Sequence, residues 1–229
     1  MNHQRIRIWD LPTRLFHWTL VISVIAAIVT GKAGGNLMDW HGRIGILIVG
    51  LVAFRIVWGL LGSTYARFAQ FLPTPAKINA YLRGELHTEG HNPLGALSVF
   101  ALLAILLVQS VSGLVSNDDI SFYGPLYDIA GRELSNKLTG IHHQLSNVLI
   151  ALVALHVVAV LFYVVHKKQD LVKPMITGWK ESAKGESARG GGIVAVLVAL
   201  VVAGAAVYGA SGAWITPPPP PPPVETPNW

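Results

Sequence analysis

Five long apolar runs constrain the fold of this chain more than any other feature of its sequence. They cover residues 11–31, 40–61, 93–115, 139–166 and 193–214. Each is long enough for an α-helix to cross the hydrocarbon core of a bilayer, which takes about 20 residues. The pattern predicts an all-α membrane protein with five transmembrane helices. Asp10 and Asn92 are expected to be N-caps, each followed by a proline in the first turn.

Composition agrees with a lipid environment and excludes several kinds of cofactor site. Charged residues make up 13% of the 229 residues, against about 25% in a typical soluble domain. The formal charge is +5, but the basic residues cluster between the apolar runs, so we expect no nucleic-acid partner. The lack of cysteine excludes disulfides, iron–sulfur clusters and covalently attached c-type haem. A redox cofactor would need histidine, methionine or oxygen ligands.

The distribution of lysine and arginine predicts the orientation in the membrane. Most basic residues lie before or early in the first run, after the second and after the fourth. By the positive-inside rule, the N-terminus is then cytoplasmic in a bacterial inner (plasma) membrane. The third connection, which contains Asp118, Asp119, Asp128 and Glu133, would face the periplasm. The fifth run would carry the C-terminus to the periplasm.

Four histidines lie inside predicted spans, where ionisable residues are costly and are candidates for function. They are His17, His41, His142 and His156. The last two are fourteen residues apart, so on a helix they face nearly the same way and are separated by about 21 Å. That distance is too long for one metal centre. Each would serve a different centre, as two haems stacked along the membrane normal require.

The topology predicts a partner for each of these two histidines. The second and fourth spans both begin at the periplasmic side, so His41 is expected to pair with His142. His17 would pair with His156 on the cytoplasmic side, although His156 should lie deeper unless its helix tilts or extends beyond the lipid. His143 faces about 220° away from His156 on the helix and remains an alternative ligand. Hydrogen bonding between helices is the alternative for the whole set.

Other residues near these histidines suit a haem. Gly45 lies four residues after His41, on the same helix face, and would leave room for a flat macrocycle. Arg43, Arg55 and Arg14 are candidate partners of haem propionates, or else interfacial residues whose charged ends reach water. His87, Glu89 and His91 could form a zinc site, but we expect a solvated loop there.

Several motifs resemble one known family in the same order. They are residues 7–18 (RIWDLPTRLFHW), 40–45 (WHGRIG), 55–59 (RIVWG), 62–63 (GS), 65–68 (YARF), 90–95 (GHNPLG) and the segment 142–156. The sequence is similar over residues 5–180 to the bacterial cytochrome b561 and nickel–iron hydrogenase cytochrome b family. The resemblance implies a four-helix bundle with two non-covalent haems b, ligated by the four histidines. It also implies electron exchange between membrane quinone and a periplasmic redox partner.

We expect four parts in the chain. Residues 1–180 would form the di-haem four-helix domain, 181–191 a cytoplasmic linker, 192–214 an additional transmembrane helix, and 215–229 a proline-rich periplasmic tail. The fifth helix and the tail depart from the family. The proline run 217–223 predicts a stiff polyproline II spacer, which is either a disordered tail or a tether for a periplasmic partner.

Three functions remain open at this point. The first is an electron-transfer subunit, rather than a complete enzyme, that links the quinone pool to a periplasmic cytochrome c or hydrogenase-like protein. The second is a stand-alone haem oxidoreductase acting on superoxide or ferric iron at the periplasmic haem. The third is a haem-free scaffold or transporter. Gln109, Ser110 and Ser112 are candidates for a quinone pocket, although bonding between helices also explains them. A homo-oligomer is left open.

Overall fold

The computed structural model describes residues 4–183 and 185–216. Five helices in this part are long and apolar enough to cross a membrane. They are α1 (Leu11–Ala33), α2 (Met38–Leu61), α5 (Pro93–Gly113), α6 (Tyr127–Val165) and α8 (Ile193–Ser211). The shorter elements are β1 (Gln4–Arg7), η1 (Gly35–Leu37), η2 (Thr64–Ala66), α3 (Phe68–Phe71), α4 (Pro75–Leu82), α7 (Val172–Thr177) and β2 (Trp179–Ser182). The prediction of an all-α membrane protein with five long helices is confirmed.

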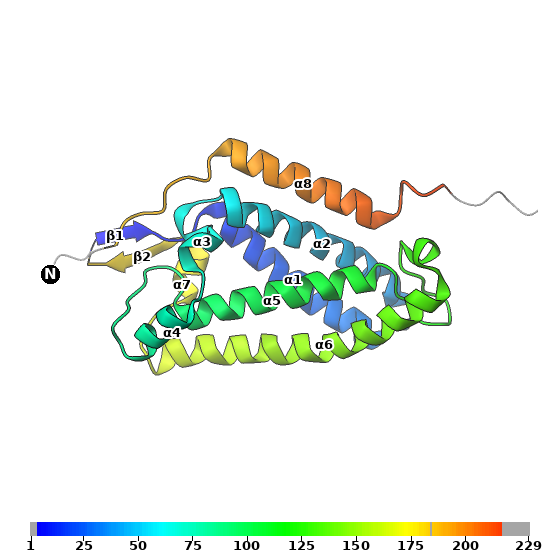
Figure 1. Cartoon of the computed structure of the whole chain (residues 1–229), viewed down its shortest axis with the longest axis horizontal. Coiled ribbons are helices and arrows are strands. Elements are labelled where there is room, and N and C mark those ends of the chain that lie inside the picture. Colours follow the sequence, from blue (N-terminus) through cyan, green and yellow to red (C-terminus); the bar gives the residue numbers. More distant parts are fainter. Residues whose placement is uncertain (1–3, 184, 217–229) are drawn as a thin grey trace, which may run out of the picture.

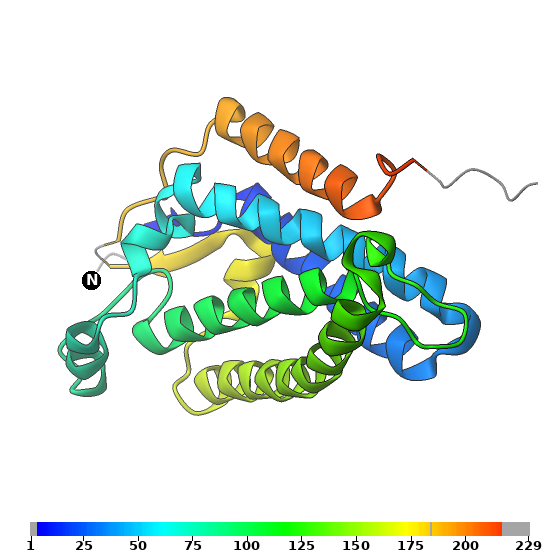
Figure 2. The same cartoon turned by 45° about the vertical axis from the view of Figure 1, so that its right-hand side comes forward.

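Helices α1, α2, α5 and α6 form a bundle, and α8 lies outside it along α2 (Figure 1). The contact with α8 is close because small residues line it. A Cβ added to Gly50 of α2 would come within 2.6 Å of Val207 on α8, and Ala199 of α8 is fully buried. The turned view in Figure 2 keeps α8 on the same side of the bundle.

Local sequence signals set the starts of two of these helices. The Asp10 carboxylate accepts a hydrogen bond from the Thr13 amide at 2.6 Å, and the Asn92 side chain accepts one from the Gly95 amide at 2.7 Å. Both helices have proline in the first turn, where a missing N–H leaves no intrahelical bond unmade. The two predicted N-caps are confirmed.

Helix α6 begins earlier than the sequence predicts. The predicted span started at residue 139, but the helix runs from Tyr127, with a kink at Gly131, where φ is 71°. Residues 127–138 are mostly polar, so a search for apolar runs finds only the lipid-facing part of the helix. The helix therefore extends beyond that apolar run at its N-terminal end.

A small antiparallel sheet covers the end of the bundle where α1 begins. Strand β1 pairs with β2 in a register that sets Gln4 opposite Ser182 and Arg7 opposite Trp179. Beneath it, Ile6, Ile8 and Trp9 form a separate buried cluster. We call this end of the bundle the sheet end. We call the opposite end, where residues 114–126 connect α5 to α6, the loop end.

The segment between β2 and α8 is held against the sheet end. The Thr64 amide donates to the Arg189 carbonyl at 2.9 Å, the Ala188 amide to the Arg7 carbonyl at 2.7 Å, and the Tyr65 hydroxyl to the Glu186 carbonyl at 2.7 Å. The chain thus crosses the sheet end as an extended strap, residues 185–192, before α8 begins. The proline run lies outside the described residues.

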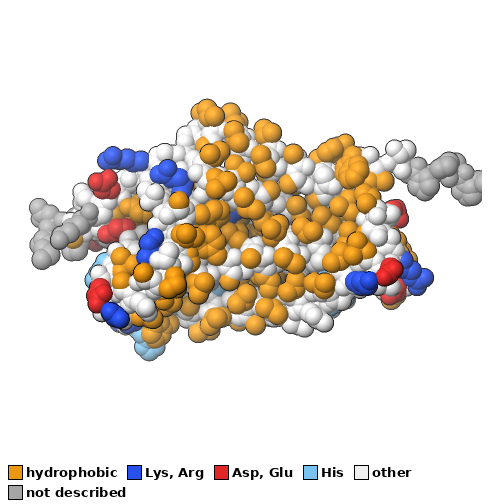
Figure 3. Space-filling model, viewed as in Figure 1, with side chains coloured by type: hydrophobic (Ala, Val, Ile, Leu, Met, Phe, Trp, Pro, Cys, Tyr) orange, Lys and Arg blue, Asp and Glu red, His pale blue; other side chains and the backbone are white. Residues whose placement is uncertain are grey.

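Apolar side chains cover the sides of the molecule, and charged ones gather at its two ends (Figure 3). The largest internal cluster lies between the two ends and joins Val24 of α1, Val52 of α2, Ile105 of α5 and Leu149 of α6. This distribution suits a chain whose sides contact lipid and whose ends contact water.

Candidate functional site

The structure brings His41 and His142 together at the loop end. His41 lies near the start of α2 and His142 lies on α6, and their ring centroids are 6.0 Å apart with the planes at 87°. Two metal–nitrogen bonds of about 2 Å each, plus the distance from each nitrogen to its own ring centre, give a comparable separation. The predicted pairing of these two helices at one depth is therefore present in the fold.

Hydrogen bonds determine which nitrogen of each ring carries the proton. His41 Nδ1 lies 2.9 Å from the Ala27 carbonyl oxygen, and His142 Nδ1 lies 2.9 Å from the Gln109 carbonyl oxygen. A carbonyl oxygen can only accept, so Nδ1 is the donor in both rings. Nε2 then keeps its lone pair, which is the arrangement of an imidazole ready to bind a metal.

Two glycines that the sequence analysis did not single out allow these hydrogen bonds. A Cβ at Gly31 of α1 would lie 2.8 Å from His41 Cε1, and a Cβ at Gly113 of α5 would lie 2.9 Å from His142 Cε1. Either contact is shorter than packed side chains tolerate. Each ring therefore approaches a helix backbone through its Nδ1–Cε1 edge, at a position where the side chain is missing.

Polar residues of α5 complete the surroundings of His142. The Gln109 amide nitrogen is 3.2 Å from His142 Nε2, and the Ser112 hydroxyl is 3.3 Å from Nδ1. Ser110 instead bonds the Leu107 carbonyl of its own helix. Gln109 and Ser112 thus make the bonds between helices that the sequence allowed as the alternative to a quinone pocket.

The second histidine pair lies toward the sheet end. His17 of α1 and His156 of α6 are close enough to interact electrostatically. Within the described part of the chain, the hydrogen-bond partner of His156 Nδ1 is the Ser98 hydroxyl of α5, at 3.4 Å. His17 Nδ1 is buried without a hydrogen-bond partner among residues 4–183 and 185–216. The surroundings of this pair differ from those of the pair at the loop end.

His91 also faces this region, so the prediction of a solvated loop is wrong at this residue. Its ring lies 4.7 Å from the ring of Trp9 and 4.3 Å from that of Phe71. Burial lowers the pKa of His91 to about 3, and the nearby charges of Arg55, His17 and His156 act in the same direction. The connection between α4 and α5 folds back over the helix ends, which a local reading of its polar sequence could not reveal.

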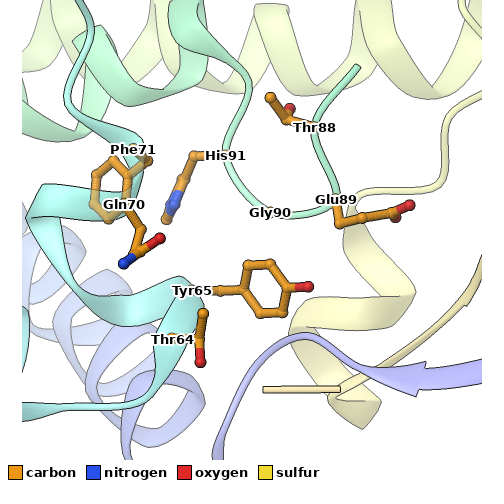
Figure 4. Close-up of a pocket in the computed structure, with 8 residues that line it drawn as sticks. All are labelled: Thr64, Tyr65, Gln70, Phe71, Thr88, Glu89, Gly90 and His91. Carbon is orange, nitrogen blue, oxygen red and sulfur yellow. The ribbon is translucent and has the colours of Figure 1, made fainter. Parts of the chain in front are cut away.

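A cavity of about 120 Å³ opens beside His91 (Figure 4). Its wall includes Tyr65, Gln70, Phe71 and Glu89. The Glu89 carboxylate accepts hydrogen bonds from Ser182 at 2.6 Å and from Lys180 at 3.1 Å. Burial raises the pKa of Glu89, but these two bonds and the lysine charge outweigh it and leave the pKa below its ordinary value. Glu89 therefore ties this connection to β2, and His87 is exposed.

The remaining predicted residues occupy different environments. Arg55 is 3% exposed, its guanidinium lies 4.6 Å from the Phe68 ring centroid, and its Nη1 has no partner within the described part of the chain. Arg43 is exposed beside Trp40, and Arg14 donates to the Ile176 carbonyl at 2.5 Å. A Cβ at Gly45 would meet no described atom within 4 Å.

These features fit haem. In His41 and His142, Nδ1 donates to a carbonyl and Nε2 keeps the lone pair that binding of haem iron requires; in His142 this lone pair faces the Gln109 amide nitrogen. A buried arginine whose Nη1 has no partner in the described part of the chain suits a propionate, and the open space at Gly45 suits a macrocycle edge. The histidines come from α1, α2 and α6, and Arg55 and Gly45 both lie on α2, so the folded bundle is needed to assemble the set.

Comparisons with known proteins agree with this chemistry. The family model for prokaryotic cytochrome b561 matches residues 8–178. A probable Ni/Fe-hydrogenase B-type cytochrome subunit of Azotobacter vinelandii is 25% identical over 214 residues, which cover 76% of this chain and 88% of that protein. The protein of the same description from Rhizobium leguminosarum bv. viciae is 21% identical over 218 residues, covering 78% and 90%. No solved structure gives a significant match. The chain belongs to the prokaryotic cytochrome b561 family, as a multi-pass membrane cytochrome of the b type that serves electron transfer.

Proposed function

We propose that this chain is the electron-transfer subunit of a bacterial inner-membrane oxidoreductase and holds two haems b. His41 with His142 at the loop end would hold one haem, and His17 with His156 toward the sheet end would hold the other. The observation that carries the proposal is the approach of His41 and His142, whose ring centroids are 6.0 Å apart and whose Nδ1 atoms both donate to backbone carbonyls.

The long helix α6 separates the two levels. His142 and His156 are fourteen residues apart on it, which is about 21 Å at 1.5 Å per residue. Leu149 lies midway, is 5% exposed, and belongs to the cluster with Val24, Val52 and Ile105. This apolar layer excludes water between the levels and keeps both centres in a medium of low polarity.

Haem supplies reversible one-electron chemistry, and the protein determines where that chemistry occurs. The histidines hold each iron at a fixed depth. Arg55, buried at the level of His17 and His156, offers an N–H and a positive charge to a propionate. The sides of the bundle give access to lipid-soluble quinone, and the two ends give access to water-soluble proteins.

Charge supports the orientation with the sheet end in the cytoplasm. Arg5, Arg7 and Lys180 lie at the sheet end, on the paired strands. The loop end carries Asp118 and Asp119 between α5 and α6. This asymmetry follows the positive-inside rule and supports a position of the His41–His142 level toward the periplasm. The curated relatives are named as hydrogenase cytochrome subunits, which supports a hydrogenase-like partner at this end; a cytochrome c is the alternative.

Haem content tests the proposal directly. The purified chain should bind two haems, measured by pyridine haemochrome absorbance per mole of protein. The variants His156→Ala and His41→Ala should each retain one. His143→Ala is the matched control, because His143 is adjacent to His142 but exposed, and it should retain both. A colourless wild-type preparation would overturn the function, whereas unchanged haem content in His156→Ala would overturn the ligand assignment alone.

A further inference from the structure

The loop end contains the same structural arrangement twice. On α1, the carbonyl of Ala27 accepts from His41, and the ring covers Gly31, four residues later. On α5, the carbonyl of Gln109 accepts from His142, and the ring covers Gly113, again four residues later. We call each pair of residues, 27 with 31 and 109 with 113, a glycine seat.

The spacing of four residues has a simple physical reason. In an α-helix the carbonyl of one residue accepts from the amide four residues later, and its second lone pair points outward beside that later residue. A side chain there would block the approach of a second donor. With glycine at that position, the imidazole can reach the carbonyl, because the ring then occupies the space that a Cβ atom would fill.

Neither histidine at the other level is held this way. His17 Nδ1 is buried without a hydrogen-bond partner in the described ranges, and His156 Nδ1 has only the Ser98 hydroxyl at 3.4 Å. The charges differ as well. Arg55 is 3% exposed and lies near His91, which also interacts with His17 and His156. Arg43, on the side of the glycine seats, is exposed.

Both differences act on the stability of an oxidised iron. An imidazole whose Nδ1–H donates to a carbonyl is a stronger electron donor through Nε2, which favours ferric iron. A buried cation that is poorly screened favours the ferrous state, which carries one positive charge fewer. The first effect lowers the reduction potential at the loop-end level, and the second raises the reduction potential at the sheet-end level. Both effects therefore widen the difference in reduction potential between the two levels.

We infer that the two glycine seats give the haem at His41 and His142 a lower reduction potential than the haem at His17 and His156. This inference rests on the proposed function, because it presupposes two haems. Its consequence is that an electron shared between the levels resides at the level of Arg55. We expect at least a tenfold preference, which corresponds to a potential difference of about 59 mV for one electron.

Two alanine variants test the role of the seats. Gly31→Ala and Gly113→Ala should each raise the lower of the two potentials in a redox titration monitored by the haem α-band, and leave the higher one in place. The matched control is Gly204→Ala on α8, where a Cβ would meet no described atom within 4 Å; both potentials should stay unchanged. A variant series in which the lower potential does not rise, or in which the higher one moves instead, would contradict the inference.

A second measurement needs no substitution, and it tests the order of the two reduction potentials even if a glycine variant loses a haem. Right-side-out membrane vesicles are titrated with electron paramagnetic resonance detection while an impermeant gadolinium chelate is outside. The chelate broadens the signal of the haem nearer the periplasm, and we expect that signal to belong to the centre reduced at the lower potential. Equal or reversed potentials with two haems present overturn this inference alone. A preparation with one haem or none overturns the proposed function as well.

Discussion

Removal of the Asp10 carboxylate should destabilise the whole sheet end. Asp10 is 7% exposed and receives three hydrogen bonds: from the Thr13 amide at 2.6 Å, from the Trp58 indole at 3.2 Å, and from the Ser63 hydroxyl. Trp58 and Ser63 are 0% and 3% exposed, so water cannot replace the lost acceptor. Trp58 would keep its second contact, to the Thr13 hydroxyl at 3.1 Å.

The cost of Asp10→Ala follows from these contacts. Loss of the N-cap costs about 1 kcal/mol, and an unsatisfied buried hydroxyl costs about 1–3 kcal/mol. The free energy of unfolding should therefore fall by about 2–4 kcal/mol. At about 2–4 °C per kcal/mol for a chain of this size, the Tm in detergent should fall by roughly 4–16 °C. The loss of Soret absorbance on heating measures it.

A second aspartate provides a matched control. Asp170 accepts a hydrogen bond from the Lys173 amide at 3.0 Å but is exposed. Asp170→Ala removes the same chemical group where water can replace it, so its effect should be below about 1 kcal/mol. If Asp10→Ala and Asp170→Ala melt at the same temperature, the buried hydrogen bonds at Asp10 do not stabilise the bundle and the reasoning is refuted.

Further predictions concern the strap and the connection at the loop end. Tyr65→Phe removes one hydrogen bond to the strap, which is worth about 1 kcal/mol, so trypsin should cleave after Arg189 roughly fivefold faster. Thr88→Val, at an exposed residue, is the control. An unchanged cleavage rate in Tyr65→Phe would show that the bond does not hold the strap. Hydrogen bonds from the backbone N–H groups of Phe122, Ile120 and Ser121 lower the pKa of Asp118. The ionised carboxylate therefore stabilises the connection at pH values above its ordinary pKa of 3.8. This stabilisation is lost as the pH falls through the lower pKa of the folded state. The protection factors for amide exchange over residues 118–123, each relative to the intrinsic rate at the same pH, should therefore be constant from about pH 7 to pH 5 and lower in Asp118→Ala. Equal protection in the two proteins would contradict this.

Local sequence signals predict the long helices of this fold well. Apolar length locates all five membrane helices, and Asp10 and Asn92 begin two of them where the capping pattern places them. These features depend on neighbours within a few residues. The sequence did not predict the start of α6 at Tyr127, because the first turns of this helix are polar and no apolar run marks a helix that continues beyond lipid.

Features that depend on distant contacts could not be predicted. Pairing of β1 with β2 joins residues about 175 positions apart, and strands of four residues give no periodic signal of their own. Gly31 and Gly113 are ordinary glycines in apolar helices until the rings of His41 and His142 are placed against them. His91 lies in a polar stretch and becomes half-buried only when Trp9 and Phe71 reach it.

The order of synthesis gives the sheet a further consequence. Strand β1 leaves the ribosome first, but its partner β2 follows only after the four helices of the bundle have been made. At 5–20 residues per second, that delay is roughly 9–35 s. The two glycine seats need only residues up to His142, so they can form before β2 exists. Assembly should therefore proceed from one side of the membrane to the other, and the N-terminal strand should pair last, onto a bundle whose helices are already in place.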